Sequence, residues 1–226
     1  YKVGQAISKE MTKYNITYFL GPAMNIHRNP LCGRNFEYIS EDPLLSGIIA
    51  GSIVRGVESI KGNYATIKHF ACNNQEDNRQ HSNSHVSERA LREIYLKGFE
   101  IAVKEARPSA VMTSYNLING VYTADSYDLC TNVLRNEWGF DGVVMSDWHS
   151  TMDTTGSNPL AIKAGNDLIM PGGDYYKNKM FEGYRNGEVT LEELKRAASH
   201  IIKAVINSHV ATRSDNPINV NMFDGD

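Results

Sequence analysis

Apolar residues recur along much of the chain at the spacing of one face of a helix. In segment 88–106 they fall at positions i, i+3, i+4 and i+7 and continue in that pattern, which predicts a long amphipathic helix. The same period predicts helices over 3–14, 127–138 and 190–206, and a helix that Pro43 opens and that runs to residue 60. Thr190 and Glu193 have the spacing of a capping box at the start of the last helix.

Short apolar runs separate these helices and predict buried strands. The runs are "TYFLGPAM", "YATIKHF", "SAVMTSY", "GVVMSDW" and "NDLIMPGG". Strands that alternate with amphipathic helices are typical of a parallel sheet covered on both faces. The pattern therefore predicts an α/β fold, either an open doubly wound sheet or part of an eight-stranded barrel.

Polar side chains follow three of the predicted strands at the point where each ends. They are Lys68 and His69, Tyr115 and Asn116, and Asp147 and Trp148. Several strand ends that each supply a reactive side chain are how a (β/α) barrel builds its site, and no G-x-G-x-x-G fingerprint or phosphate loop supports the doubly wound alternative. We therefore predict a TIM-like barrel that is incomplete in this chain, with about five βα units, because a whole barrel needs about 250 residues.

Composition narrows the class of protein without identifying it. The chain has 226 residues, a formal net charge of −3 and no basic stripe, which argues against a nucleic-acid partner. Its longest apolar stretch is too short to span a membrane. The three cysteines are odd in number and far apart, which is not a disulfide framework and favours a reducing compartment such as the cytoplasm. The chain begins with Tyr1 and has no signal-peptide pattern, so we expect it to be a piece of a longer protein.

Each polar residue at a strand end has an ordinary structural interpretation as well as a functional one. Asp147 could cap a helix or pair with a cation, or it could be a catalytic carboxylate acting as nucleophile, base or metal ligand. Lys68 and His69 could be solvated loop-edge residues. Arg34 could form a surface ion pair, and Tyr115 could be a buried ring with a wet hydroxyl.

Taken together, these residues favour a site for a polyhydroxylated substrate. Arginine, lysine, histidine and tyrosine donors surround one carboxylate, and Trp148 offers an aromatic face beside it. That combination suits the chemistry of a glycosidase. A metal site is disfavoured because His81 and His85 are the only closely spaced histidines and no H-E-x-x-H or C-x-x-C occurs, and a serine hydrolase is disfavoured because no G-x-S-x-G occurs.

Four long motifs closely resemble the barrel domain of glycoside hydrolase family 3, in its β-glucosidase branch. They are "GPAMNIHRNPLCGRNFEYISEDP", "IKHFACNNQEDNR", "VSERALREIYLKGFEIAVKEARPSAVMTSYNLING" and "LRNEWGFDGVVMSDW". The resemblance runs from about residue 4 to about residue 206. It implies a catalytic barrel over 1–208, with 209–226 as a linker or extension that leads out of it.

The resemblance implies a role for each candidate residue. The aspartate of the "SDW" motif, here Asp147, is the catalytic nucleophile in that family. Its "GR" arginine and "KH" pair bind hydroxyls of the sugar, here Arg34, Lys68 and His69. The tyrosine of "SYN", here Tyr115, lies near the nucleophile, and Trp148 is expected to form a wall where sugars stack. No cofactor is implied.

The implied activity is that of a retaining, exo-acting β-glucosidase that releases terminal β-D-glucosyl residues. In the family the acid/base is a glutamate on an α/β-sandwich domain, and an earlier "DGP"-type aspartate grips the sugar; neither lies in this chain. The alternatives are a β-xylosidase, a β-N-acetylglucosaminidase or a non-catalytic sugar-binding barrel. "KHFACNNQEDNR" departs from the loop that carries the acid/base histidine of the N-acetylglucosaminidases, so His81 and His85 are not given that role. Self-association into a homo-oligomer stays open.

The pair Lys68 and His69 raises a geometric conflict. Successive side chains of a regular strand point to opposite faces, so both could not reach one ligand. Since the resemblance implies that both do, we predict a backbone irregularity between Lys68 and Phe70, either a bulge or a non-proline cis bond, that turns both toward Asp147.

Overall fold

A parallel sheet forms the centre of the molecule in the computed structural model, which describes residues 1–212. Its strands are β1 (Tyr18–Phe19), β2 (Tyr64–Phe70), β4 (Ala110–Thr113) and β7 (Val143–Met145), in the order β1-β2-β4-β7. Each strand follows the previous one after a long crossover, and all three pairings are parallel. The predicted α/β class with a parallel sheet is confirmed.

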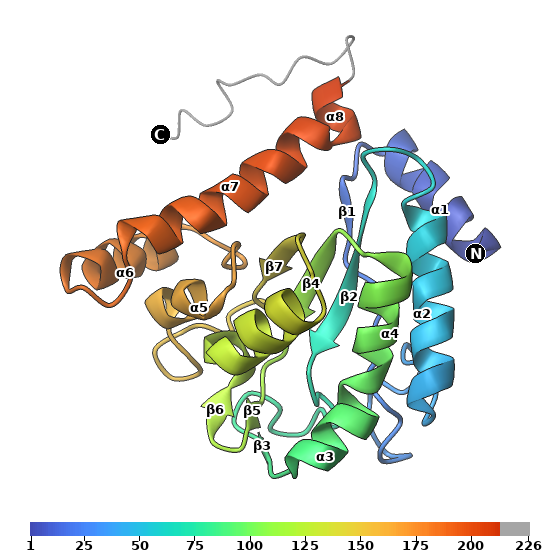
Figure 1. Cartoon of the computed structure of the whole chain (residues 1–226), viewed down its shortest axis with the longest axis horizontal. Helices are drawn as coiled ribbons and strands as arrows, with labels where there is room; N and C mark the ends of the chain where they lie inside the picture. Colours follow the sequence, from blue (N-terminus) through green and yellow to red (C-terminus); the bar gives the residue numbers. More distant parts are fainter. Residues whose placement is uncertain (213–226) are drawn as a thin grey trace.

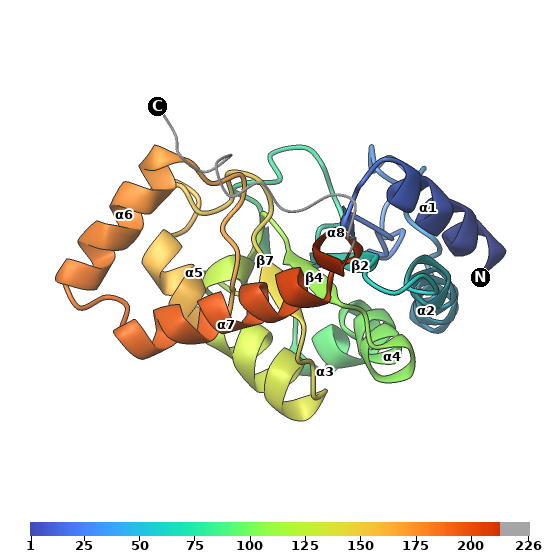
Figure 2. The same cartoon turned by 90° about the horizontal axis from the view of Figure 1, so that it is seen from above.

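The two faces of the sheet are both covered, because side chains of successive strand residues alternate between them. On one face Ile67, Val111 and Val144 pack in a fully buried core with residues of α2 (Pro43–Val57), α4 (Lys97–Ala106) and η3 (Asp128–Glu137). On the other face Met112 and Met145 pack with Ile201 and Ala204 of α7 (Leu191–Asn207). Figure 1 shows α7 lying across the amino ends of the strands, and Figure 2 shows it crossing beside β4 and β7.

Most predicted helices occur close to their expected bounds. α1 (Lys2–Lys13) and α2 pack side by side, and the capping box of Thr190 and Glu193 starts α7. The predicted helix 88–106 is a continuous helical run made of α3 (Glu88–Ala90), the π-helical turn η1 (Leu91–Tyr95) and α4. The π-helical turn has more residues per turn than an α-helix, so the predicted apolar stripe is interrupted there: Leu91 and Tyr95 pack against the core, whereas Ile94 is 40% exposed.

α2 approaches both of its helical neighbours through glycines. A Cβ atom added at Gly47 would lie 2.8 Å from the Gly98 carbonyl oxygen of α4, and one added at Gly56 would lie 2.3 Å from the Tyr1 carbonyl oxygen. α1 brings its own glycine to the contact, since a Cβ atom at Gly4 would lie 2.3 Å from the Ile53 carbonyl oxygen. The spacing of α1, α2 and α4 therefore depends on the absence of side chains at these positions.

The fifth predicted strand is reduced to a single bridge beside β7. Only Leu168 forms a bridge with Met145, although backbone hydrogen bonds continue from Ser146 to Leu168 and from His149 to Met170. The Asp167 carboxylate accepts the Val144 N–H at 2.9 Å, so a side chain takes the place of a ladder hydrogen bond.

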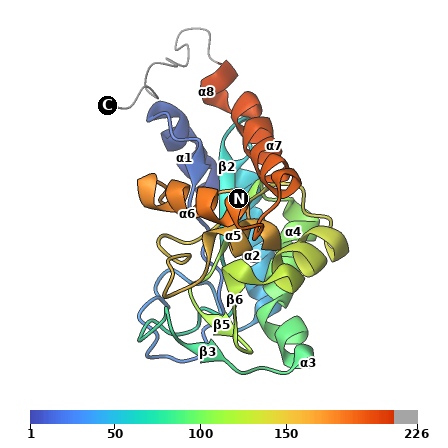
Figure 3. The ribbon, with the colours of Figure 1, turned by 90° about the vertical axis from the view of Figure 1, so that its left-hand side faces the viewer.

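Several elements lay outside the sequence-based prediction. They are the small sheet of β3 (Asn83–Ser84), β5 (Leu117–Ile118) and β6 (Val121–Tyr122), the turn η2 (Thr123–Asp125), and helices α5 (Asn158–Ala164) and α6 (Asp174–Arg185). The small sheet lies at the end toward which the strands of the main sheet point (Figure 1, Figure 3). Segment 209–226, expected to be a linker, begins with the short helix α8 (His209–Thr212), and 213–226 lie outside the described residues. Among residues 1–212, none of the helices has the length and apolar character needed to cross a membrane.

Candidate functional site

The polar residues predicted from the strand ends gather at the carboxyl end of the sheet. Lys68 and His69 are among the last three residues of β2, Tyr115 follows β4, and Asp147 follows β7. His69 Nε2 lies 3.7 Å from Asp147 Oδ2, and Tyr115 interacts with the same carboxylate. The prediction that these three strand ends converge on one face is confirmed.

Asp147 is buried, and its two carboxylate oxygens differ. Oδ1 accepts the Trp148 N–H at 2.7 Å, whereas Oδ2 accepts no hydrogen bond of normal geometry from any described residue. Burial raises the pKa of Asp147 above the ordinary aspartate value, although the Trp148 N–H, the Tyr115 hydroxyl, Lys68 and Arg34 all act to lower it. The residue therefore presents one anchored oxygen and one free oxygen to the site.

The backbone at the end of β2 departs from regular strand geometry, as the sequence analysis predicted. The Lys68–His69 peptide bond is cis, and the pairing of β2 with β4 shifts register between Ile67 and Phe70. Both side chains lie near Asp147. His69 Nε2 is 3.7 Å from Asp147 Oδ2, and the charge of Lys68 is close enough to lower the pKa of the Asp147 carboxyl.

The charge states of this pair follow from burial. Burial lowers the pKa of Lys68, while nearby Glu37 and Asp147 act to raise it. Burial, and then the positive charges of Arg34, Lys68 and Arg79, hold the pKa of His69 well below its usual value. His69 is therefore neutral near pH 7.

The ion pair of Arg34 is not a fully solvated surface pair, which was the structural interpretation of this residue. Its guanidinium contacts Glu37 and lies 3.9 Å from Glu76, and its side chain is 17% exposed. Burial acts to lower the pKa of Arg34, but Glu37, Tyr38 and Glu76 outweigh it, so the pKa is raised. Arg34 is thus a permanently charged donor held at the edge of the site.

Arg79 was missed by the sequence analysis and stands over the Tyr115 ring, 4.5 Å from its centre. Glu76 holds it through an ion pair of 2.6 Å and also faces Arg34. Burial, and then the charge of Asp147, raise the pKa of Tyr115 to about 12, so its hydroxyl keeps its proton. Arg79 lies in the loop "NNQEDNRQHSNSH", whose polar composition does not reveal which residue folds back over the site.

Trp148 projects outward from the carboxylate that it anchors, with 48% of its surface exposed. The segment after it is held by α6: His149 Nδ1 lies 2.5 Å from the Tyr176 hydroxyl, and Asp153 pairs with Lys179 at 3.0 Å. An exposed indole on a restrained segment is a suitable stacking surface for a sugar ring.

The arrangement can carry out nucleophilic chemistry on a neutral polyol. One carboxylate oxygen is free, three cationic side chains can donate to hydroxyls, and a neutral histidine stands beside the carboxylate. The other carboxylates near these cations in the described part of the chain, Glu37 and Glu76, are held in ion pairs with Arg34 and Arg79, so neither is a free second carboxylic acid of the kind that a complete glycosidase pair requires.

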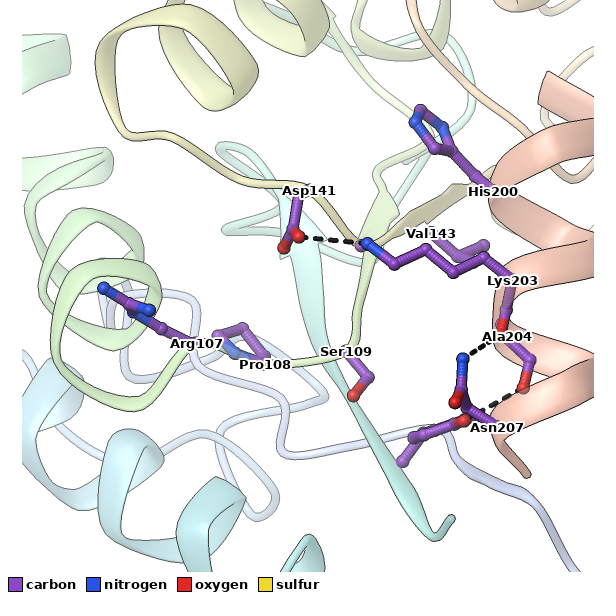
Figure 4. A pocket seen from close by; sticks show the side chains of 11 residues that line it. Arg107, Pro108, Ser109, Asp141, Val143, His200, Lys203, Ala204 and Asn207 are labelled. Atoms are coloured by element: carbon purple, nitrogen blue, oxygen red, sulfur yellow. Dashed lines mark hydrogen bonds and ion pairs between the residues drawn. The ribbon is translucent and has the colours of Figure 1, made fainter. Parts of the chain in front are cut away.

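A separate cavity of about 230 Å³ lies at the other end of the sheet (Figure 4). It is lined by Tyr64 at the start of β2, by residues 107–109 before β4, by residues 141–143 at the start of β7, and by His200, Lys203, Ala204 and Asn207 of α7. Its charged groups include the pair Asp141 and Lys203, whose atoms are 3.2 Å apart and whose side chains are largely exposed. The cavity shares no residue with the cluster around Asp147.

Comparison with known proteins identifies the family. Residues 1–204 match the model of the "Glycosyl hydrolase family 3 N terminal domain". The chain is 45% identical over 212 residues to a β-glucosidase of Ruminococcus albus, covering 90% of this chain and 22% of that protein. It is 46% identical over 216 residues to an exo-α-(1→6)-L-arabinopyranosidase of Bifidobacterium longum, covering 96% of this chain and 28% of that protein.

Solved structures agree. β-Glucosidase 3B from Thermotoga neapolitana, in complex with glucose, superimposes with a TM-score of 0.86 at 48% identity, covering 97% of this chain and 32% of that one. The chain spans about a quarter of the length of the curated relatives above. The sheet and its helices are therefore part of a TIM-like barrel, as the strand ends predicted, and the chain belongs to glycoside hydrolase family 3.

Proposed function

We propose that this chain provides the nucleophile and the sugar-binding wall of a retaining, exo-acting β-glucosidase. The observation that carries the proposal is the free Oδ2 of Asp147, buried among Lys68, Arg34 and a neutral His69. A surface aspartate has no such surroundings, and Asp147 does not begin a helix as the capping residue Asp42 does.

In the proposed reaction Asp147 Oδ2 attacks the anomeric carbon of a terminal β-D-glucosyl residue. The bond from that carbon to the departing oxygen breaks, and a glutamate outside this chain, on an α/β-sandwich domain, gives that oxygen a proton. Water then attacks the glycosyl-enzyme, the same glutamate takes a proton from it, and the Asp147 carboxylate is restored.

The other side chains divide the work of binding. Arg34, Lys68 and Arg79 donate to sugar hydroxyls, and Tyr115 keeps its proton beside the carboxylate. Trp148 stacks on the sugar from the open side. The preference for glucose rests on the relatives, since several are named β-glucosidases and the Thermotoga neapolitana enzyme was solved with glucose.

One relative supports a second candidate substrate. The Bifidobacterium longum protein is named an exo-α-(1→6)-L-arabinopyranosidase and is as similar to this chain as the β-glucosidases are. An α-L-arabinopyranoside has the ring configuration of a β-D-galactoside without its exocyclic carbon, so the nucleophile would attack the same face. Aryl β-glucosides, β-xylosides and α-L-arabinopyranosides should therefore be compared.

The decisive test is covalent trapping with an activated 2-deoxy-2-fluoro-β-glucoside. Its leaving group departs without an acid, so the missing glutamate does not matter. We expect one label per chain, on the peptide that contains Asp147, and no label on Asp147→Asn. Asp141→Asn, which alters an exposed carboxylate at the other end of the sheet, is the matched control and should label normally.

Two outcomes would contradict the proposal. A label on another peptide of folded Asp147→Asn would place the nucleophile elsewhere. Binding of glucose without labelling, and without formation of a glycosyl azide from an activated glucoside and azide, would indicate a non-catalytic sugar-binding barrel.

A further inference from the structure

Asn25 follows β1 at the point where backbone pairing with β2 stops. Up to that point the two segments exchange main-chain hydrogen bonds, from Thr66 to Gly21, from Lys68 to Pro22 and from Met24 to Lys68. At His69 the Asn25 side chain takes over this pairing. Its Nδ2 donates to the His69 carbonyl at 2.8 Å, and its Oδ1 accepts the His69 N–H at 2.8 Å.

These two contacts fix which end of the amide is oxygen. A backbone carbonyl can only accept and a backbone N–H can only donate, so Oδ1 must face the His69 N–H. The same Oδ1 lies 3.3 Å from His69 Nδ1. An acceptor at that place requires a proton on Nδ1.

The ring of His69 then has its other nitrogen free to accept. His69 is neutral, since it is buried with Arg34, Lys68 and Arg79 nearby, so a proton on Nδ1 leaves a lone pair on Nε2. Nε2 is the atom that lies 3.7 Å from Asp147 Oδ2. Two acceptors therefore stand side by side in a region otherwise supplied with cationic donors.

We propose that Asn25 is a positioning residue that holds His69 with its proton on Nδ1, so that Nε2 accepts a hydrogen bond from one substrate hydroxyl beside Asp147. The inference rests on the proposed function for its substrate. This arrangement makes the position beside Asp147 selective for a group that can both donate and accept a hydrogen bond. A hydroxyl there donates a hydrogen bond to Nε2 and can accept one from a cation such as Lys68. A fluorine atom in its place could not donate.

The tautomer can be measured in the free protein by nitrogen NMR of ¹⁵N-histidine-labelled chain at pH 8. We expect a protonated Nδ1 and an unprotonated Nε2 at His69 in the wild type and in Asn25→Asp, which keeps the Oδ1 acceptor. Asn25→Ala should lose this preference and populate the Nε2-protonated form. Asn63→Ala is the matched control, because Asn63 is equally buried and bonds Ser8 and Thr12 instead; it should leave the His69 signals unchanged.

Binding of monodeoxyfluoro-glucoses gives the second readout. We expect one fluorinated position to weaken binding by about tenfold or more relative to glucose in the wild type and in Asn63→Ala, and to lose most of that discrimination in Asn25→Ala. A proton on Nε2 in the wild type would overturn the inference while leaving labelling at Asp147, and thus the proposed function, intact. Absence of both labelling and glucose binding would overturn the proposed function, while the NMR result would still decide whether Asn25 sets the tautomer.

Discussion

At the scale of single residues, the candidate site combines a buried carboxylate with cations that are themselves restrained. Burial alone would favour a protonated Asp147, and the surrounding donors offset part of that effect. The balance leaves the pKa of Asp147 above the ordinary aspartate value. A nucleophile must be ionised, so this balance sets the acidic limit of the proposed reaction.

The rate of trapping by the fluoroglucoside should therefore fall on the acidic side at a pH above that of a solvated aspartate. Replacing Lys68 by methionine removes a charge that lowers the pKa of Asp147 and should move the acidic limb to higher pH. The measurement is the labelling rate against pH for both proteins. Lys203→Met, at the other end of the sheet, is the control, and an unmoved limb in Lys68→Met would contradict the electrostatic role of Lys68.

The residues of the site were predictable to the extent that they end strands. Asp147, Lys68, His69 and Tyr115 follow apolar runs, and strand ends of a parallel sheet meet at one edge. Asn25 carried no such signal because its partner is 44 positions away, and only tertiary pairing reveals it. Resemblance to a family supplied the expected roles, which the geometry accommodates.

At the scale of elements, the strongly periodic helices and fully buried strands were predictable, and the weakly patterned elements were not. α6 is rich in tyrosine and lysine and buries only Tyr176 and Gly183, so no apolar stripe marks it. The small sheet is built from strands of two residues, too short for any period to appear.

The glycines of α2 lead to a prediction about helix packing. Gly47→Ala should destabilise the protein by about 1–3 kcal/mol, because the new methyl group would meet the backbone of α4. Gly51→Ala, one turn later on the same helix, meets Ala106 only at 3.4 Å and should be neutral or stabilising by up to about 1 kcal/mol. Urea unfolding of the two variants checks this. Equal destabilisation by both would show that helix spacing does not depend on Gly47.

At the scale of the whole molecule, the two ends of the sheet differ in the kind of residue they carry. The carboxyl end carries the candidate site, and the amino end carries side-chain hydrogen bonds that connect a helix to the strands. Glu58, just after α2, accepts the backbone N–H groups of Ala65 and Ser109 with a single oxygen, at 3.0 and 2.8 Å. It thereby joins α2 to the starts of β2 and β4.

This junction makes a prediction for the pH dependence of stability. Burial is the main cause of the raised pKa of Glu58, so the folded protein holds that proton more tightly than the unfolded chain does. The associated stability is present at low pH and is lost as pH rises through the folded-state pKa. Glu58→Gln keeps the accepting oxygen without the charge, so its stability relative to the wild type should increase between about pH 4 and pH 8.

The matched variant is Glu58→Ala, which leaves two backbone N–H groups without their acceptor. It should be less stable than the wild type at every pH, by about 1–3 kcal/mol for each group. Thermal unfolding at several pH values separates the two effects. A constant difference between Glu58→Gln and the wild type would mean that the carboxyl has the same pKa in both states.

The hydrogen bond from the Trp148 N–H to Asp147 Oδ1 also has an entropic consequence. A free carboxylate rotates about its last bond, and selecting one orientation for attack would reduce the rate of every turnover. Here the torsion is already restricted when the chain folds, by a main-chain donor that no substitution at position 148 except proline can remove. A glutamate at position 147 would have the same charge, yet its oxygens would lie one methylene farther out and beyond this restraint. In the proposed reaction, aspartate at this position therefore provides a fixed direction of attack, which is set by the backbone at the end of β7.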